Sequence, residues 1–171
     1  MADIKPELLK ELRERTGAGL MDCKKALIEA NGDIDKAVEI LRKMGIAKSE
    51  KKLTKEARQG SISSYLSSDR KLGILVELNC ETDFVAVTDD FKNLLNNILE
   101  AIKLNKPKSI DELKNLKLPS GDTIENEIKI LISKVGENII LRRFSIFETK
   151  NGFIEIYIHP GNMLASMVEI E

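Results

Sequence analysis

GILVELNCETDFVAV, residues 73–87, carries the most informative residue pattern of this chain. Its apolar residues Ile74, Val76 and Leu78 alternate with polar ones, and this two-residue period predicts a half-buried strand. The strand leads into a short loop, Glu81 to Phe84. A lone phenylalanine is more often a core residue, but a strand that ends in an acid and Phe84 also suits a tip presented to a partner. Both interpretations stay open on these residues.

The composition limits the class of protein. The 171 residues are enough for one good core and a small satellite domain. The 27 basic and 28 acidic residues balance, so net charge predicts no general attraction to nucleic acid or to anionic membranes. No apolar run reaches the ~20 residues of a membrane span, and the first residues, Met-Ala-Asp-Ile-Lys, are too polar for a secretory signal. We expect a cytoplasmic protein, or one in an organelle matrix after cleavage of a leader.

Residues 1–46 are predicted to form a three-helix N-terminal domain. Leu8, Leu9 and Leu12 form an apolar stripe behind Pro6 in the first helix, and the second covers about 20–30. The third runs from Ile34 to Met44 and is closed by Gly45. Leu20 and Met21 follow the glycine-rich break between the first two helices, and a core position and an exposed one are equally expected for them.

Residues 47–59 are predicted to be a basic linker helix. From Arg42 to Arg58 there are seven basic residues against two acidic ones. Such a run can track phosphates, but no aromatic residues are interleaved with it, which favours a solvated linker.

Residues 60–171 are predicted to form an α+β core, an antiparallel sheet with packed helices. Two strands flank the turn at 67–70. An amphipathic helix then starts at 88–90 and ends before Pro107, and a short helix runs from 109 or 110 to 116. A further amphipathic helix, capped by Asp122 or Thr123, covers 124–135. A strand over 139–148, a turn at Asn151-Gly152 and a strand over 153–158 are predicted to form a hairpin.

An internal repeat links the two ends of this core. At a constant shift, Gly60, Ile62, Tyr65, Leu72, Val76, Glu77 and Leu78 fall on Gly152, Ile154, Tyr157, Leu164, Val168, Glu169 and Ile170. The shared pattern predicts that a second hairpin repeat begins at residue 152.

No catalytic or metal motif is present in the sequence. The single histidine, His159, has no cysteine or serine in a nucleophile setting, and Glu81 with Asp83 are too few carboxylates for a good cation site. Cys23 and Cys80 lack metal-ligand spacing and are expected to be small core thiols. We therefore expect a protein that binds a partner, without enzymatic activity, metal or cofactor.

The chain resembles the translation elongation factor Ts family of guanine-nucleotide exchange factors for elongation factor Tu. The resemblance is carried by LRERTGAGLMDCKKALIEANGDIDKAVEILRKMG at 12–45, GILVELNCETDFVA at 73–86, GENIILRRF at 136–144 and YIHPG at 157–161.

The resemblance implies a partner and a set of contact residues. The three-helix domain would be ubiquitin-associated-like and would dock on the GTP-binding domain of elongation factor Tu through Lys10, Arg13, Leu20 and Met21. Thr82, Asp83, Phe84 and Val85 match the family motif whose Asp and Phe push into the partner near its magnesium and phosphate site. His159 would belong to the core surface that faces the partner's other domains.

The chain also departs from the family pattern. The second hairpin, Gly161 to Val168, lacks most glycines of the family pattern, and some short members pair two chains to complete the core, so a homodimer is possible. The alternative function is a nucleic-acid or protein interaction module that uses the basic linker and the three-helix domain. If the chain is an exchange factor, no direct contact with nucleic acid or membrane is expected.

Overall fold

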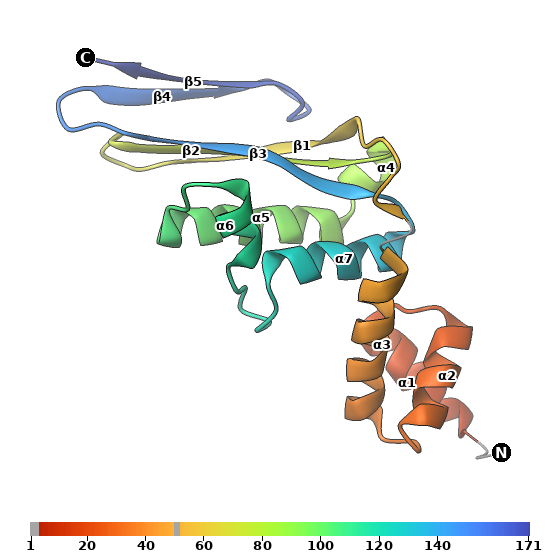
Figure 1. Ribbon diagram of the computed structural model, residues 1–171. Helices are drawn as coiled ribbons and strands as arrows, with labels where there is room; N and C mark the ends of the chain where they lie inside the picture. Colours follow the sequence, from red (N-terminus) through yellow and green to blue (C-terminus); the bar gives the residue numbers. More distant parts are fainter. Residues whose placement is uncertain (1–3, 50–51) are drawn as a thin grey trace.

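The computed structural model describes residues 4–49 and 52–171 and confirms the predicted α+β class. Helices come first in the chain, and antiparallel sheets with packed helices follow (Figure 1). The first three residues of the polar N-terminus, and Glu50 and Lys51 of the predicted linker, lie outside the described residues.

Three helices form the N-terminal unit: α1 (Pro6–Thr16), α2 (Leu20–Glu29) and α3 (Ile34–Ser49). Their apolar faces enclose a small separate core, formed by Leu12, Cys23, Ala26, Leu27, Ala30, Ala37 and Leu41. Gly17 in the left-handed conformation ends α1, as the glycine-rich break predicts. The stripe residues Leu8 and Leu9 pack against this core from its edge.

Helix α3 does not end at Gly45, as the sequence predicts, but continues to Ser49. Gly45 is buried and lies against α7 (Ile124–Val135), where a Cβ on residue 45 would be 3.3 Å from both Cβ and Oγ of Ser133. The glycine therefore permits a close helix–helix approach and does not terminate the helix.

The predicted linker helix over 47–59 is wrong for its second half. Residues 52–55 form a turn, and residues 56–58 have no regular secondary structure. Their backbone bonds to the core: the Asn138 side chain donates to the carbonyl oxygen of Lys55, and Arg142 Nη2 donates to that of Ala57 at 3.0 Å. Ala57 is buried, so the segment is part of the core surface.

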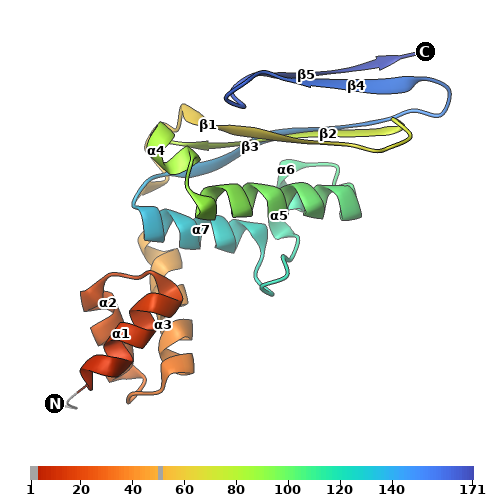
Figure 2. The same ribbon diagram turned by 180° about the vertical axis from the view of Figure 1, so that it is seen from behind.

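The core is built on a three-stranded antiparallel sheet of β1 (Gln59–Leu66), β2 (Leu72–Cys80) and β3 (Ile139–Glu148), in the order β1-β2-β3. One face is covered by α5 (Asp89–Asn105), α6 (Ile110–Asn115) and α7 (Figure 2). Ile74, Val76 and Leu78 of β2 point into this layer, as their alternation predicts. Thr88 caps α5 and Thr123 caps α7, each hydroxyl accepting a backbone N–H three residues on.

The predicted hairpin of β3 with the next strand is wrong. β4 (Phe153–Ile158) pairs with β5 (Ala165–Ile170) in a second sheet that lies over the face of the first sheet away from the helices (Figures 1 and 2). That face carries Gly73, and its open surface receives Ile154 and Met167. Stacking buries Ile154 completely, whereas pairing beside β3 would leave the central strand uncovered on this side.

The two hairpins have the same register. Ser61 pairs with Leu78 and Tyr65 with Ile74 in β1–β2; at the same shift, Phe153 pairs with Ile170 and Tyr157 with Ser166 in β4–β5. The sequence repeat thus coincides with a repeat of strand pairing.

Candidate partner-binding site

The residues that follow β2 form one helical turn, α4 (Asp83–Ala86), where the sequence predicts a loop. Phe84 is 79% exposed, while the next residue, Val85, is 8% exposed and belongs to the core beneath the sheet. The helical turn sends these neighbouring side chains in opposite directions. Phe84 is therefore not a core residue, and Val85 anchors the turn that carries it.

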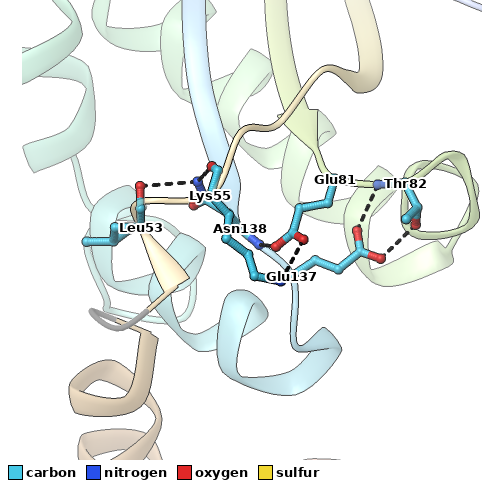
Figure 3. A network of polar contacts seen from close by, with 6 residues as sticks. All are labelled: Leu53, Lys55, Glu81, Thr82, Glu137 and Asn138. Atoms are coloured by element: carbon cyan, nitrogen blue, oxygen red, sulfur yellow. Dashed lines mark hydrogen bonds and ion pairs between the residues drawn. The ribbon is translucent and has the colours of Figure 1, made fainter.

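Asp83 and Thr82 complete the tip. Asp83 is exposed in the first turn of α4, where a carboxylate is favourable for the helix dipole. Thr82 is the N-cap residue, but its N–H and its hydroxyl both donate to the carboxylate of Glu137, at 3.0 and 2.7 Å. The start of α4 is thus held by a residue 55 positions away in the sequence (Figure 3).

Glu81 is held on the other side of the same junction. Its carboxylate accepts the backbone N–H of Asn138 at 2.7 Å and pairs with Lys55 Nζ at 3.0 Å. These contacts lower the pKa of Glu81, the hydrogen bond from Asn138 being the larger cause. Glu81 and Asp83 therefore do not act together as a cation site.

The fully buried Asn138 fastens the segment that enters the core. Its Nδ2 donates to the carbonyl oxygens of Leu53 and Lys55, at 3.3 and 2.5 Å (Figure 3). The tip, the α7–β3 junction and the linker consequently meet in one polar network.

Cys80 lies directly beneath the tip. It is buried, and its thiol donates to the carbonyl oxygen of Thr82 at 3.0 Å. Burial, with a smaller effect from the negative charge of Glu137, raises its pKa to about 11. Cys80 and Cys23 are both free and buried, in agreement with the expected core thiols.

The predicted N-terminal contact residues lie apart from the tip. Leu20 and Met21 are 51% and 64% exposed at the start of α2. Lys10 and Arg13 are exposed on α1, and Lys10 lies 3.9 Å from Glu14. Both views place α2 and α4 toward the same side of the molecule (Figures 1 and 2).

His159 lies on a third segment, the turn between β4 and β5. It is exposed, and its Nδ1 is 2.9 Å from the hydroxyl of Tyr157. The same turn is tied to the first sheet because the Ile62 N–H donates to the carbonyl oxygen of Asn162 at 2.8 Å.

The N-terminal unit and the core meet at a cavity of about 490 Å³ between α3 and α7. Arg42 of α3 pairs there with Asp122, and a Cβ on Gly17 would be 2.7 Å from Cε of Lys134. Lys134 Nζ in turn pairs with Asp90 of α5 at 2.8 Å. Arg42, Lys55 and Arg58 thus each pair with a carboxylate, which leaves this basic run less available to a nucleic acid.

Glu137, Asn138 and Lys55 were not predicted as site residues. The one local signal was an acid and an amide directly after Gly136, the glycine that ends α7. In the part of the chain that the structure describes, no group of three or more His, Cys, Asp or Glu side chains is arranged to hold a metal ion. Within the same residues, no helix has the length and apolar character needed to cross a bilayer.

The fold is that of an α+β module with a three-helix N-terminal unit, and it carries an exposed aromatic residue on a braced helical turn. The sequence model of a family described as Elongation factor TS matches residues 81–171, and the chain belongs to this elongation factor Ts family.

Curated relatives of the same name match nearly the whole chain. The elongation factor Ts of Clostridium kluyveri is 47% identical over 170 residues, covering 98% of this chain and 56% of that protein. That of Halothermothrix orenii is 49% identical over 165 residues, covering 95% and 55%, and that of Clostridium perfringens 44% over 167 residues, covering 98% and 55%. The chain spans about half the length of these relatives.

Proposed function

We propose that this chain is a guanine-nucleotide exchange factor that promotes GDP release from elongation factor Tu. The observation that carries the proposal is Phe84, a large aromatic side chain left 79% exposed on a turn whose neighbour Val85 is buried. Leaving an aromatic ring in water is unfavourable, so a fixed and exposed one favours a partner that covers it. Membership of the elongation factor Ts family supports the identity of that partner.

The proposed mechanism is insertion of the Asp83–Phe84 tip near the partner's magnesium and phosphate site. Burial of Phe84 supplies roughly 1.5–3 kcal/mol, and only when the partner opens to receive it. Binding then favours the open state, and by reciprocity the nucleotide and this protein weaken each other's affinity. Exposed Asp83 acts beside Phe84, either on the magnesium shell or on the geometry of the partner's loop.

Phe84 alone does not supply the whole effect. Weakening nucleotide binding ~1000-fold requires about 4 kcal/mol of coupling. We therefore assign the remainder to the N-terminal unit, residues 1–46, which docks through Lys10, Arg13, Leu20 and Met21, and to the core, residues 60–171, including His159. Residues 47–59 connect them. The protein acts in the cytoplasm, where its GTPase partner works, and needs neither a cofactor nor direct contact with nucleic acid.

We further propose a homodimer that covers the outer face of β4–β5. Phe153, Tyr157, Val168 and Ile170 are 40%, 55%, 49% and 43% exposed there. The equivalent face of β1–β2 is buried under α5 and α7. A second copy of the chain would bury this apolar face. The mass of the free protein in solution tests this, since a monomeric mass at micromolar concentration contradicts it.

The exchange activity is tested by release of a fluorescent GDP analogue from elongation factor Tu. The protein is expected to accelerate release, and Phe84→Ala to lose most of the acceleration while keeping its thermal unfolding temperature. Leu104→Ala is the matched control, because Leu104 on α5 is 77% exposed and lies outside the tip. No acceleration by the wild type at micromolar concentration contradicts the function. Unfolding of Phe84→Ala, or equal loss in Leu104→Ala, contradicts the role of the tip.

A further inference from the structure

The junction between α7 and β3 lies opposite the junction between β2 and α4. Cys80 and Ile139 form the last pair of the β2–β3 ladder. Beyond this pair the register places Glu81 opposite Asn138 and Thr82 opposite Glu137. The two strands separate at this point, one into the tip and the other into α7.

Side chains replace the backbone ladder past the last pair. The Asn138 N–H donates to the carboxylate of Glu81 at 2.7 Å, and the Thr82 N–H donates to the carboxylate of Glu137 at 3.0 Å. Each strand therefore satisfies a free N–H of the other with an acidic side chain. Hydrogen bonds to an ionised acceptor are about twice as strong as neutral ones, so this junction is a firm one.

Glu137 is itself placed by the end of a helix. Gly136, in the left-handed conformation, closes α7 with its N–H donating to the carbonyl oxygen of Ile132 at 2.8 Å. Only Glu137 and Asn138 separate this cap from β3. The carboxylate of Glu137 thus projects from a short segment fixed at both ends.

The direction of α4 depends on Thr82. Its backbone is extended, with φ −124° and ψ 156°, and the helical turn begins at the next residue. Its hydroxyl does not cap α4; it donates to Glu137 at 2.7 Å. A change in the backbone of Thr82 would therefore turn α4 and redirect Phe84.

We propose that Glu137 is a positioning residue for the tip: by accepting both hydrogen bonds of Thr82, it fixes the direction in which α4 presents Asp83 and Phe84. The inference rests on the proposed exchange function. It also involves the linker, because the neighbouring Asn138 binds the carbonyl oxygens of Leu53 and Lys55. The linker from the N-terminal unit is thus bonded to the same junction that positions the tip. The N-terminal contact surface and the tip are therefore held in a fixed relative arrangement.

The first test is a titration of GDP release from elongation factor Tu with Glu137→Ala. A misdirected tip still binds through the other surfaces, so the release rate at saturating protein is expected to fall about tenfold or more, because Glu137→Ala removes both hydrogen bonds from Thr82. The half-saturating concentration is expected to change much less. Glu125→Ala is the control, since it removes an α7 carboxylate that pairs with Lys129, at 3.0 Å, on the same helix. A normal saturating rate for Glu137→Ala overturns the proposal.

The second test uses Thr82. Thr82→Ser keeps the hydroxyl that donates to Glu137 and is expected to lose less of the saturating rate than a variant without that hydroxyl. Thr82→Val removes it and is expected to lower that rate, and the Thr82→Val, Glu137→Ala double variant is expected to be no slower than Glu137→Ala alone. If the fold-losses in saturating rate of the two single variants multiply in the double variant, Thr82 and Glu137 have independent roles and the proposal is overturned.

A third readout does not need the partner. The amides of Val87 and Thr88 close the turn of α4 on the carbonyl oxygens of Asp83 and Val85, at 3.3 and 3.1 Å. Their hydrogen exchange is expected to be about tenfold faster in Glu137→Ala and unchanged in Glu125→Ala. If the wild type does not accelerate GDP release, the proposed function fails while this measurement still decides the positioning role. Unchanged protection of Val87 and Thr88 in Glu137→Ala overturns it.

Discussion

Gly60 and Gly152 occupy the same place in two hairpins, each with its Cα against a carbonyl oxygen of the paired strand. A Cβ on Gly60 would lie 2.2 Å from the carbonyl oxygen of Leu78, and a Cβ on Gly152 would lie 2.1 Å from that of Ile170. Leu78 and Ile170 are also equivalent in the repeat. The repeat therefore preserves a close backbone approach as well as the apolar pattern.

Alanine at either glycine is expected to destabilise the protein. The clash is with backbone, which cannot turn away as a side chain can, so we expect a loss of about 1–3 kcal/mol in the free energy of unfolding, measured by urea denaturation. Gly19→Ala is the control: a Cβ there would lie 3.7 Å from Asp22 Oδ2, an ordinary contact, so the variant is expected to cost only about 0.5 kcal/mol, because alanine is a poorer N-cap of α2 than glycine. Equal stability of Gly152→Ala and Gly19→Ala would show that the approach is not tight.

The residue pattern predicts elements whose determinants are local. The length and caps of α5 and α7 follow from apolar periodicity and from Thr88 and Thr123. The end of α3 does not, because Gly45 serves contact with Ser133 on a distant helix. The pairing of β4 likewise depends on which sheet face is open, a tertiary property that no period encodes.

The same distinction between local and tertiary determinants applies to the candidate site. The strand and the unusual position of Phe84 could be predicted from residues 73–87, but its exposure could not, because a lone phenylalanine is more often a core residue. Glu137 was not predicted as a site residue because its hydrogen bonds to Thr82 join positions that are 55 residues apart in the sequence. A sequence shows the tip more readily than the residues that hold it.

The ion-paired carboxylate of Glu81 predicts an acid-dependent loss of stability. Its pKa in the folded protein is lowered from the ordinary value of about 4.3, so its contribution is fully present above that value and is lost as pH falls through the lowered one. At neutral pH, Glu81→Gln is expected to be less stable than the wild type, and the difference to shrink as pH falls below about 4. Chemical denaturation at several pH values measures this. A stability difference that is constant with pH would contradict it.

The Cys80 thiol is expected to react slowly. With a pKa of about 11, its thiolate at pH 8 is roughly two hundredfold rarer than that of an ordinary thiol, and burial slows access further. A chromogenic disulfide reagent applied to Cys23→Ala, which leaves only Cys80, measures the rate. Adding Glu137→Gln removes a negative charge that raises this pKa, so the reaction is expected to quicken several-fold. Equal reaction rates with and without Glu137→Gln would show that the charge of Glu137 does not raise the pKa of Cys80.

Arg42 of α3 and Asp122 before α7 join the N-terminal unit to the core, and their separation is expected to loosen that attachment. Their side chains are 31% and 13% exposed, so the pair is worth about 1 kcal/mol, the upper end for surface ion pairs. In Arg42→Gln, the distance distribution between spin labels at Glu7 and Asn97 is expected to broaden. Arg15→Gln is the control, because it breaks the 2.9 Å Arg15–Asp35 pair inside the N-terminal unit and is expected to leave the distribution unchanged. The charge-reversed double variant Arg42→Asp, Asp122→Arg is expected to narrow the distance distribution again. Identical distributions for Arg42→Gln and Arg15→Gln would contradict the prediction. They would mean that the helix contact at Gly45 and Ser133 suffices to hold the N-terminal unit and the core together.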